Sequence, residues 1–206
     1  MSHGVVPDGA ARATRGGLAP IARFLVGAGV SANAVTVAGL LITLAGAWLI
    51  IAERPLVAFV VLLVGTLGDT LDGAVARAAG GGTKAGEFLD STLDRVSDAA
   101  LASAALLLGA RQVDALLLWA GLVLLVGSFL VPYIRAKAEA LGLGASVGLA
   151  PREARIAIYV VGVAVWALAG SETFFAAAVA AAALLAAITS VQRLVHVMGA
   201  LNERGS

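Results

Sequence analysis

The chain contains no cysteine, and only two of its 206 residues are histidines. The lack of cysteine excludes disulfide bonds, a thiolate nucleophile and thiolate-bound zinc. The two histidines, His3 and His196, are isolated in the sequence, so a nitrogen-ligated metal site is not expected. If the protein binds a metal ion, oxygen atoms must therefore be its ligands.

Charged residues are scarce as well. They make up 13% of the chain, whereas they make up about 25% of ordinary soluble domains, and apolar residues make up 60%. This composition indicates an all-α integral membrane protein. Windows of about 20 apolar residues mark transmembrane helices, and they predict six spans: 33–52, 56–78, 88–110, 115–138, 156–169 with flanking residues, and 174–197.

The first 30 residues differ from the rest of the chain. They carry Arg12, Arg15 and Arg23 among apolar residues such as Ile21 and Phe24. This spacing predicts an amphipathic helix that lies on the membrane surface or packs on a neighbouring subunit. No signal peptide is recognised, because the apolar run comes late and lacks a small-residue cleavage site. We expect a juxtamembrane helix at 1–30, one membrane domain at 31–200 and a tail at 201–206.

The basic residues predict the orientation in the membrane. Of the 14 lysines and arginines, only Arg54 and Arg111 fall in the connections after the first and third spans. Because basic residues are retained on the cytoplasmic side, both termini are expected there, and an anionic substrate is expected to be handled on that side. Trp48, Trp119 and Trp166 are expected to lie at the membrane interface or to face lipid.

Carboxylates are concentrated in one short stretch of this apolar chain. Asp69 and Asp72 share one face of a helix, and Asp90 and Asp94 lie one turn apart on a face of the next helix. A hairpin between these spans can bring both pairs together near the cytoplasmic surface. Residues 68–98 hold six of the 13 acidic residues: Asp69, Asp72, Glu87, Asp90, Asp94 and Asp98.

Four clustered carboxylates in a membrane need a positive partner. Each costs about 2.5–3.5 kcal/mol at the bilayer centre on insertion scales, and the four repel one another. Carboxylates without nearby Cys or His favour magnesium, manganese or calcium, and four of them can hold two ions for phosphoryl transfer. The alternatives are an ion network with Arg77, Lys84 and Arg95, a solvated loop, or a cation transporter. A transporter predicts two related halves, and no half-repeat is visible.

The stretch from Asp69 to Asp94 closely resembles one known family. Asp-x-x-Asp-Gly-x-x-Ala-Arg, eight residues, and Gly-x-x-x-Asp-x-x-x-Asp form the full signature of the CDP-alcohol phosphotransferases. The resemblance implies six transmembrane helices, a homodimer, and magnesium- or manganese-dependent transfer of a phosphoalcohol from a CDP-alcohol to a second alcohol, with release of CMP. It also implies that Asp69 and Asp90 bridge two magnesium ions. Asp72 would bind one ion, and Asp94 would bind the other and act as general base.

The same resemblance implies a site for the donor, CDP-diacylglycerol. Its head group is expected to contact the motif NAVT at the start of the first span and several positions around the signature. Gly73 and Ala76 have almost no side chain, so they leave room for the nucleotide. The expected donor-binding residues are Asn33, Ala34, Val35, Thr36, Gly73, Ala76, Arg77 and Thr83.

Three stretches outside the signature indicate the acceptor. PYIRAKAEALG, APREARI and SVQRL resemble stretches of family members that use inositol 1-phosphate, and the residues that bind the acceptor phosphate there correspond to Arg135, Arg155 and Arg193. Guanidinium groups bind phosphate oxygens in forked pairs. Lys137 and Arg152 are equally explained by the clustering of basic residues at cytoplasmic helix ends. The alternative acceptor is glycerol 3-phosphate, whose phosphate needs similar arginines.

Two charged residues near these motifs are expected to have partners. Arg193 lies inside an apolar helix, where an unpaired charge is costly, so an anionic ligand or a carboxylate is expected beside it. Asp98 lies three positions after Arg95, which favours an ion pair between the two. Orienting a ligand is the alternative role for Asp98.

Overall fold

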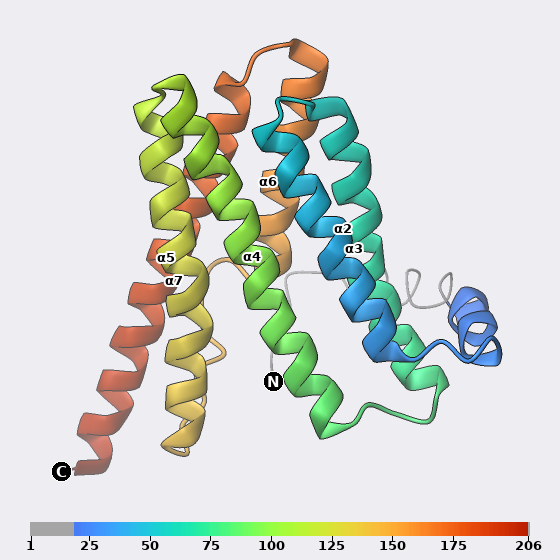
Figure 1. Ribbon diagram of the computed structural model, residues 1–206. Coiled ribbons are helices and arrows are strands. Elements are labelled where there is room, and N and C mark those ends of the chain that lie inside the picture. Colours follow the sequence, from blue (N-terminus) through green and yellow to red (C-terminus); the bar gives the residue numbers. More distant parts are fainter. Residues whose placement is uncertain (1–18, 206) are drawn as a thin grey trace.

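The computed structural model describes residues 19–205 and shows a bundle of long helices (Figure 1). The expected helical residues between 1 and 18 lie outside the described part of the chain. The six long helices are α2 (Ala32–Ile51), α3 (Pro55–Ala78), α4 (Lys84–Gln112), α5 (Ala115–Ala140), α6 (Arg152–Ala169) and α7 (Thr173–Gly205). Each of the six predicted spans corresponds to one of these helices.

Local sequence explains several helix starts. The hydroxyl of Ser31 accepts a hydrogen bond from the backbone N–H of Ala34 at 3.2 Å, and this caps α2. Pro55 opens α3, where its missing N–H costs no hydrogen bond. The hydroxyl of Thr83 caps α4 by accepting from the N–H of Gly86 at 3.0 Å. These caps satisfy first-turn amides that have no partner within the helix.

The helices run alternately up and down (Figure 1). Residues 52–54, 113–114 and 170–172 connect them at one end of the bundle. Residues 79–83 and the longer segment 141–151 connect them at the other end, which we call the acidic end because α3 finishes and α4 begins there. Helix α4 packs against α2 and α5, α3 against α2 and α6, and α7 against α5 and α6. The last turns of α3 and the first turns of α4 and α6 therefore meet at the acidic end.

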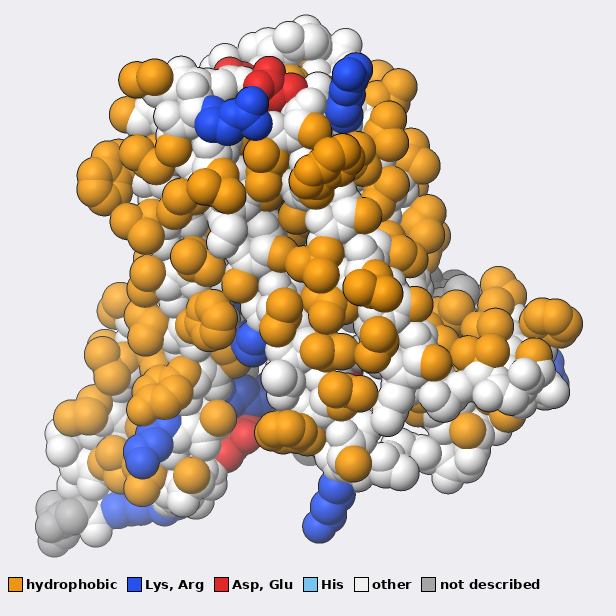
Figure 2. Space-filling view, in the orientation of Figure 1, with side chains coloured by type: hydrophobic (Ala, Val, Ile, Leu, Met, Phe, Trp, Pro, Cys, Tyr) orange, Lys and Arg blue, Asp and Glu red, His pale blue; other side chains and the backbone are white. Residues whose placement is uncertain are grey.

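Helices α2, α3, α5 and α7 are each long and apolar enough to cross a membrane. Figure 2 shows a broad belt of hydrophobic side chains between the two charged ends of the molecule. The chain is therefore a multi-pass membrane protein. Helix α4 carries the acidic series and α6 begins with charged residues, so the span predicted in each of them stays a prediction.

Small residues allow the helices to approach closely. A Cβ atom added to Gly121 of α5 would lie 2.6 Å from the backbone nitrogen of Leu106 in α4. One added to Gly127 would lie 2.7 Å from the Cβ of Ala186 in α7. Close approach at small residues is the usual packing mode of membrane helices.

The three tryptophans have different surroundings. Trp48 is 65% exposed and Trp119 is 63% exposed, in agreement with the prediction. Trp166 is buried and stacks on Phe175 with ring centroids 5.6 Å apart, so the prediction that it faces lipid is wrong. It fills the core between α6 and α7 instead.

Residues 19–27 form a short helix beside the end of α3. Ala22 is buried against Ala74 and Val75, whereas Ile21 and Phe24 are exposed. One side of this helix thus packs on the bundle and another is open. Its position on a membrane surface stays a prediction.

Candidate functional site

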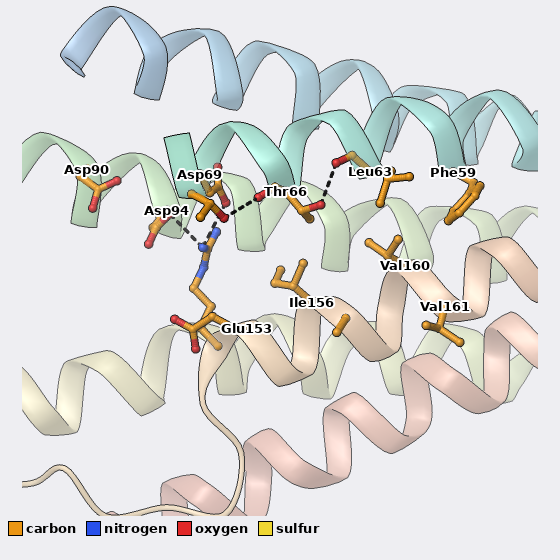
Figure 3. A pocket seen from close by; sticks show the side chains of 13 residues that line it. Phe59, Leu63, Thr66, Asp69, Asp90, Asp94, Glu153, Ile156, Val160 and Val161 are labelled. Carbon is orange, nitrogen blue, oxygen red and sulfur yellow. Dashed lines mark hydrogen bonds and ion pairs between the residues drawn. The ribbon is translucent and has the colours of Figure 1, made fainter. Parts of the chain in front are cut away.

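Three of the four signature carboxylates meet in one cavity. Asp69 on α3 and both Asp90 and Asp94 on α4 line a cavity of about 620 Å³ between α3, α4 and α6 (Figure 3). Asp69 and Asp90 are exposed, and Asp94 is about three-quarters buried. The hairpin between the two helices therefore brings Asp69 to the same cavity as Asp90 and Asp94.

The fourth carboxylate, Asp72, lies beside α2. Its Oδ2 accepts a hydrogen bond from the hydroxyl of Thr36 at 3.0 Å. Asn33 also reaches this region, because a Cβ atom at Gly86 would lie 3.2 Å from the Asn33 Oδ1. The start of α2 thus closes one side of the acidic cluster.

The other predicted donor residues surround the same place. On α3, a Cβ atom at Gly73 would lie 3.3 Å from Nη1 of Arg77, so this guanidinium lies against the bare side of the glycine. Ala76 is partly buried, and Thr83 is exposed in the turn that leads into α4. The predicted donor residues therefore come from three elements that meet at the acidic end.

Arg152 is the cation that pairs with carboxylates of this cluster. Its Nη1 lies 3.4 Å from Oδ2 of Asp69 and 3.1 Å from Oδ1 of Asp94. Its Nε donates to Oδ1 of Asp98 at 2.8 Å. The guanidinium therefore pairs with carboxylates from both α3 and α4.

Sequence reasoning gave Arg152 no definite role. Its position at the start of α6 made it look like one of the basic residues that gather at any cytoplasmic helix end. The sequence does indicate that the carboxylates need a positive partner. The residues considered for this role are Arg77, Lys84 and Arg95. The packing of α6 against α3 supplies Arg152 instead.

Asp98 forms a second layer behind the cavity. It is buried, and besides Arg152 it pairs with Arg95, whose Nη1 lies 3.6 Å from Oδ2 of Asp98. Arg95 also lies 3.7 Å from Oδ2 of Asp94 and donates to the carbonyl of Ser128 at 3.4 Å. The predicted pair between Asp98 and Arg95 is therefore present, but the shorter contact of Asp98 is with Arg152.

The donor set is chemically suited to a hard divalent cation. As the side chains stand, no three carboxylates among residues 19–205 converge closely enough to enclose an ion. Oxygens of Asp69 and Asp94, from two different helices, nevertheless already share one cation, because both contact the guanidinium of Arg152. Asp90 lines the same cavity. Oxygen ligands of this kind suit magnesium, manganese or calcium.

The three arginines predicted to bind the acceptor have different partners. Arg135 is exposed, and its Nε lies 2.8 Å from Oε1 of Glu139. Arg155 is buried and donates to the carbonyl of Ala150 at 2.9 Å. These contacts leave one arginine on the surface of α5 and tie the other to the segment that precedes α6.

Arg193 holds two pieces of backbone. It donates to the carbonyl of Val147 at 2.9 Å through Nε and to the carbonyl of Val131 at 2.7 Å through Nη1. Among the described residues, the hydrogen-bond partners of Arg193 are therefore carbonyl oxygens, and an anionic ligand beside it stays a prediction. Arg135 and Arg155 nevertheless lie close enough to Arg193 for their charges to interact.

Comparisons with known proteins point to one chemistry. A family model described as CDP-alcohol phosphatidyltransferase matches residues 29–192. The chain is 40% identical over 139 residues to an archaetidylinositol phosphate synthase of Pyrococcus horikoshii, covering 67% of this chain and 71% of the relative. It is 38% identical over 184 residues to a phosphatidylinositol phosphate synthase of Mycobacterium tuberculosis, covering 85% and 82% of the two chains.

Solved structures agree with these relatives. The crystal structure of Mycobacterium tuberculosis phosphatidylinositol phosphate synthase with CDP-DAG bound is similar, with a TM-score of 0.81 and 35% identity over 87% of this chain and 92% of that chain. A structure of the same enzyme in complex with manganese and citrate gives a TM-score of 0.80 and 34% identity, covering 88% of each chain.

Proposed function

The chain belongs to the CDP-alcohol phosphatidyltransferase family, and from this premise we propose that it transfers the phosphatidyl group of CDP-diacylglycerol to a hydroxyl of inositol 1-phosphate. The products are a phosphatidylinositol phosphate and CMP. One observation carries the proposal: a single cavity joins three carboxylates of the signature to an apolar wall. Such a cavity suits a substrate with a polar diphosphate at one end and acyl chains at the other.

The apolar wall lies between α3 and α6. Phe59 and Leu63 of α3 face Val160 and Val161 of α6, on the far side of the cavity from the aspartates (Figure 3). Phe59 is ten residues before Asp69, so the cavity follows α3 for about 15 Å. This length supports a donor whose lipid tail runs from the reacting phosphates into the apolar belt.

The four signature aspartates are the proposed metal ligands. Asp69 and Asp90 are assigned to both of two magnesium ions, Asp72 to one ion and Asp94 to the other, and manganese can take the same places. When bound, these ions neutralise the negative charge that develops on the departing CMP. The structure of the mycobacterial relative in complex with manganese supports the use of a divalent ion.

Asp94 is the proposed general base. It takes the proton of the acceptor hydroxyl as that oxygen attacks the β-phosphorus of the donor. A bond forms between the acceptor oxygen and this phosphorus, and the bond from the phosphorus to CMP breaks, so that CMP leaves with the electron pair. Asp94 lines the cavity with a quarter of its side chain exposed, which supports access to a hydroxyl there.

The donor head group is assigned to the residues that surround this cluster. The N-terminal turn of α2 contributes the stretch 33–36, and α3 contributes Gly73, Ala76 and Arg77. Thr83 completes the set in the turn before α4. These three elements meet at the acidic end, which supports one shared nucleotide site.

The acceptor phosphate is assigned to Arg135, Arg155 and Arg193. The positive charges of Arg135 and Arg155 both act on Arg193, and Glu139 is the acid that acts on it. A bound phosphate would relieve the repulsion between these positive charges, and a guanidinium group can donate two parallel hydrogen bonds to its oxygens. Glycerol 3-phosphate also carries such a phosphate, so it is the second candidate acceptor.

The environment and assembly follow the same proposal. The site and both termini are placed on the cytoplasmic side, because most of the basic residues fall at the acidic end of the bundle. All six long helices are proposed to cross the membrane. The family resemblance further suggests a homodimer.

A single assay tests the proposal. Purified protein is given CDP-diacylglycerol and magnesium with inositol 1-phosphate, glycerol 3-phosphate or free inositol, and CMP release is measured. Selective turnover with inositol 1-phosphate is expected, and chelation of divalent ions should stop it until magnesium or manganese is restored. Turnover only with glycerol 3-phosphate would replace the acceptor assignment. Activity that survives exhaustive chelation would overturn the metal assignment.

A further inference from the structure

Arg152 contacts two carboxylates that are assigned to metal ions and one that is not. Its Nη1 faces Asp69 and Asp94, and its Nε binds Asp98. Arg152 lines the large cavity and also a small neighbouring one of about 20 Å³, which Asp98 lines as well. Asp98 does not line the large cavity. The guanidinium thus bridges the reaction cavity and a buried anchor behind it.

A divalent ion and this guanidinium need the same oxygens. An ion about 2.1 Å from Oδ1 of Asp94 lies no more than about 5 Å from Nη1 of Arg152, where two cations repel. The contact from Arg152 to Asp69 is the longest of its three, at 3.4 Å, and the contact to Asp98 is the shortest, at 2.8 Å. If the contacts to Asp69 and Asp94 are lost, Arg152 still remains bound to Asp98.

We propose that Arg152 and a divalent cation exchange at Asp69 and Asp94, and that Asp98 is the positioning residue that retains Arg152 during the exchange. Arg152 is then a tethered counter-cation that competes with the metal ion and lowers its affinity. Asp98 weakens this competition by holding the Nε edge of the guanidinium outside the cavity. The proposal rests on the metal site of the proposed function.

Binding of Mn²⁺ alone to the full-length protein in detergent tests the proposal, and electron paramagnetic resonance measures the free ion. Arg152→Gln is expected to raise the Mn²⁺ affinity about tenfold. Arg95→Gln is the matched control, since Arg95 carries the same charge and contacts Asp94 and Asp98, but only at 3.6–3.7 Å. Its effect is expected to stay within about twofold. An unchanged affinity in Arg152→Gln, or an equal rise in both variants, would overturn the exchange.

A double-mutant cycle tests the anchor. Asp98→Asn should lower the Mn²⁺ affinity severalfold, because the released Arg152 then pairs more fully with Asp69 and Asp94. In the Arg152→Gln background the same change should have little effect, because no competing guanidinium remains. If Asp98→Asn lowers the affinity by the same factor in both backgrounds, Asp98 acts only through its charge and the anchoring role is wrong.

Two further variants separate folding and metal binding from the exchange. Thermal unfolding monitors each protein, and Arg152→Lys replaces Arg152→Gln if the latter does not fold. A lysine keeps the charge but cannot bridge three carboxylates with a planar fork, so a smaller rise in affinity is expected, and no rise would contradict the exchange.

Asp90→Asn should abolish Mn²⁺ binding. If the unmodified protein binds no Mn²⁺, the proposed metal site fails, whereas binding that is insensitive to Arg152 overturns the exchange alone.

Discussion

The hydroxyl of Thr36 in α2 donates a hydrogen bond to Oδ2 of Asp72 in α3 at 3.0 Å. This contact joins the NAVT motif to the acidic signature, although the two residues are 36 positions apart in sequence. The same hydroxyl lies 3.1 Å from the carbonyl of Ala32, one turn earlier in its own helix. Thr36 is thereby fixed on α2, and it can hold the carboxylate of Asp72 in one orientation.

Thr36→Val is therefore expected to weaken Mn²⁺ binding about tenfold, the lower range for loss of a residue that orients a metal ligand. The change removes the hydroxyl and keeps the volume of the side chain. A Mn²⁺ titration followed by electron paramagnetic resonance measures the effect. Thr92→Val is the control, because its hydroxyl binds the carbonyl of Phe88 in its own helix. Equal affinities in the two variants would contradict an orienting role for Thr36.

Asp94→Asn is expected to reduce kcat by at least about a hundredfold, because the amide cannot accept the proton of the acceptor hydroxyl. Binding of CDP-diacylglycerol should be largely retained, since the donor residues lie on other elements. CMP release and equilibrium donor binding measure the two effects separately. Glu87→Gln is the matched control, because Glu87 is an exposed acid on the same helix. Near-normal turnover in purified Asp94→Asn would remove Asp94 as the base.

Arg193→Gln is expected to raise the KM for inositol 1-phosphate about tenfold and to leave the KM for the donor nearly unchanged. The reason is the loss of one of three arginines assigned to the acceptor phosphate, and a charge-assisted hydrogen bond is worth about 1.5–3 kcal/mol. Arg204→Gln provides the comparison. Arg204 lies on the same helix and also holds a carbonyl of the connecting segment, that of Gly142 at 3.3 Å.

Steady-state kinetics with each substrate varied in turn distinguish two roles of Arg193. A selective rise in the acceptor KM supports phosphate binding. Equal losses for donor and acceptor, together with a lower unfolding temperature, would show that Arg193 only ties Val131 and Val147 together. An unchanged acceptor KM would contradict the assignment.

Local periodicity is sufficient to predict the helices and the acidic pairs. The spacing of Asp69 and Asp72, and of Asp90 and Asp94, is set within single helices. In the structure, three of these four aspartates line one cavity. The role of Arg152 could not be predicted in this way. It contacts Asp98 from 54 positions away and Asp69 from 83 positions away, so only the packing of three helices brings them together.

Two other results depend on features that residue types do not reveal. The partners of Arg193 are backbone carbonyls, and every residue has one, so the sequence offers no pattern that points to Val131 or Val147. Trp166 is as apolar as a lipid-facing residue, and hydropathy does not separate lipid from the protein core. Its stacking on Phe175 follows from the meeting of α6 and α7.

The close contact of α4 and α5 leads to a prediction about stability. Gly121 is buried, and a Cβ atom there would lie 2.6 Å from the backbone nitrogen and 2.8 Å from the Cα of Leu106. Backbone atoms cannot turn away as a flexible side chain can, so the helices must separate to admit a larger residue. Gly121→Val is therefore expected to destabilise the protein by about 1–3 kcal/mol, the usual cost of overpacking.

Gly199→Val separates this effect from the general consequences of replacing a helical glycine. Gly199 lies in α7, and a Cβ atom there would have no neighbour within 4 Å. Because valine has a higher helix propensity than glycine, this control should be neutral or slightly stabilising. Unfolding in detergent, followed by circular dichroism as a function of temperature, compares the two variants. Equal unfolding temperatures would mean that α4 and α5 can separate at little cost. A lower unfolding temperature in Gly121→Val alone would show that the contact between α4 and α5 is tightly packed.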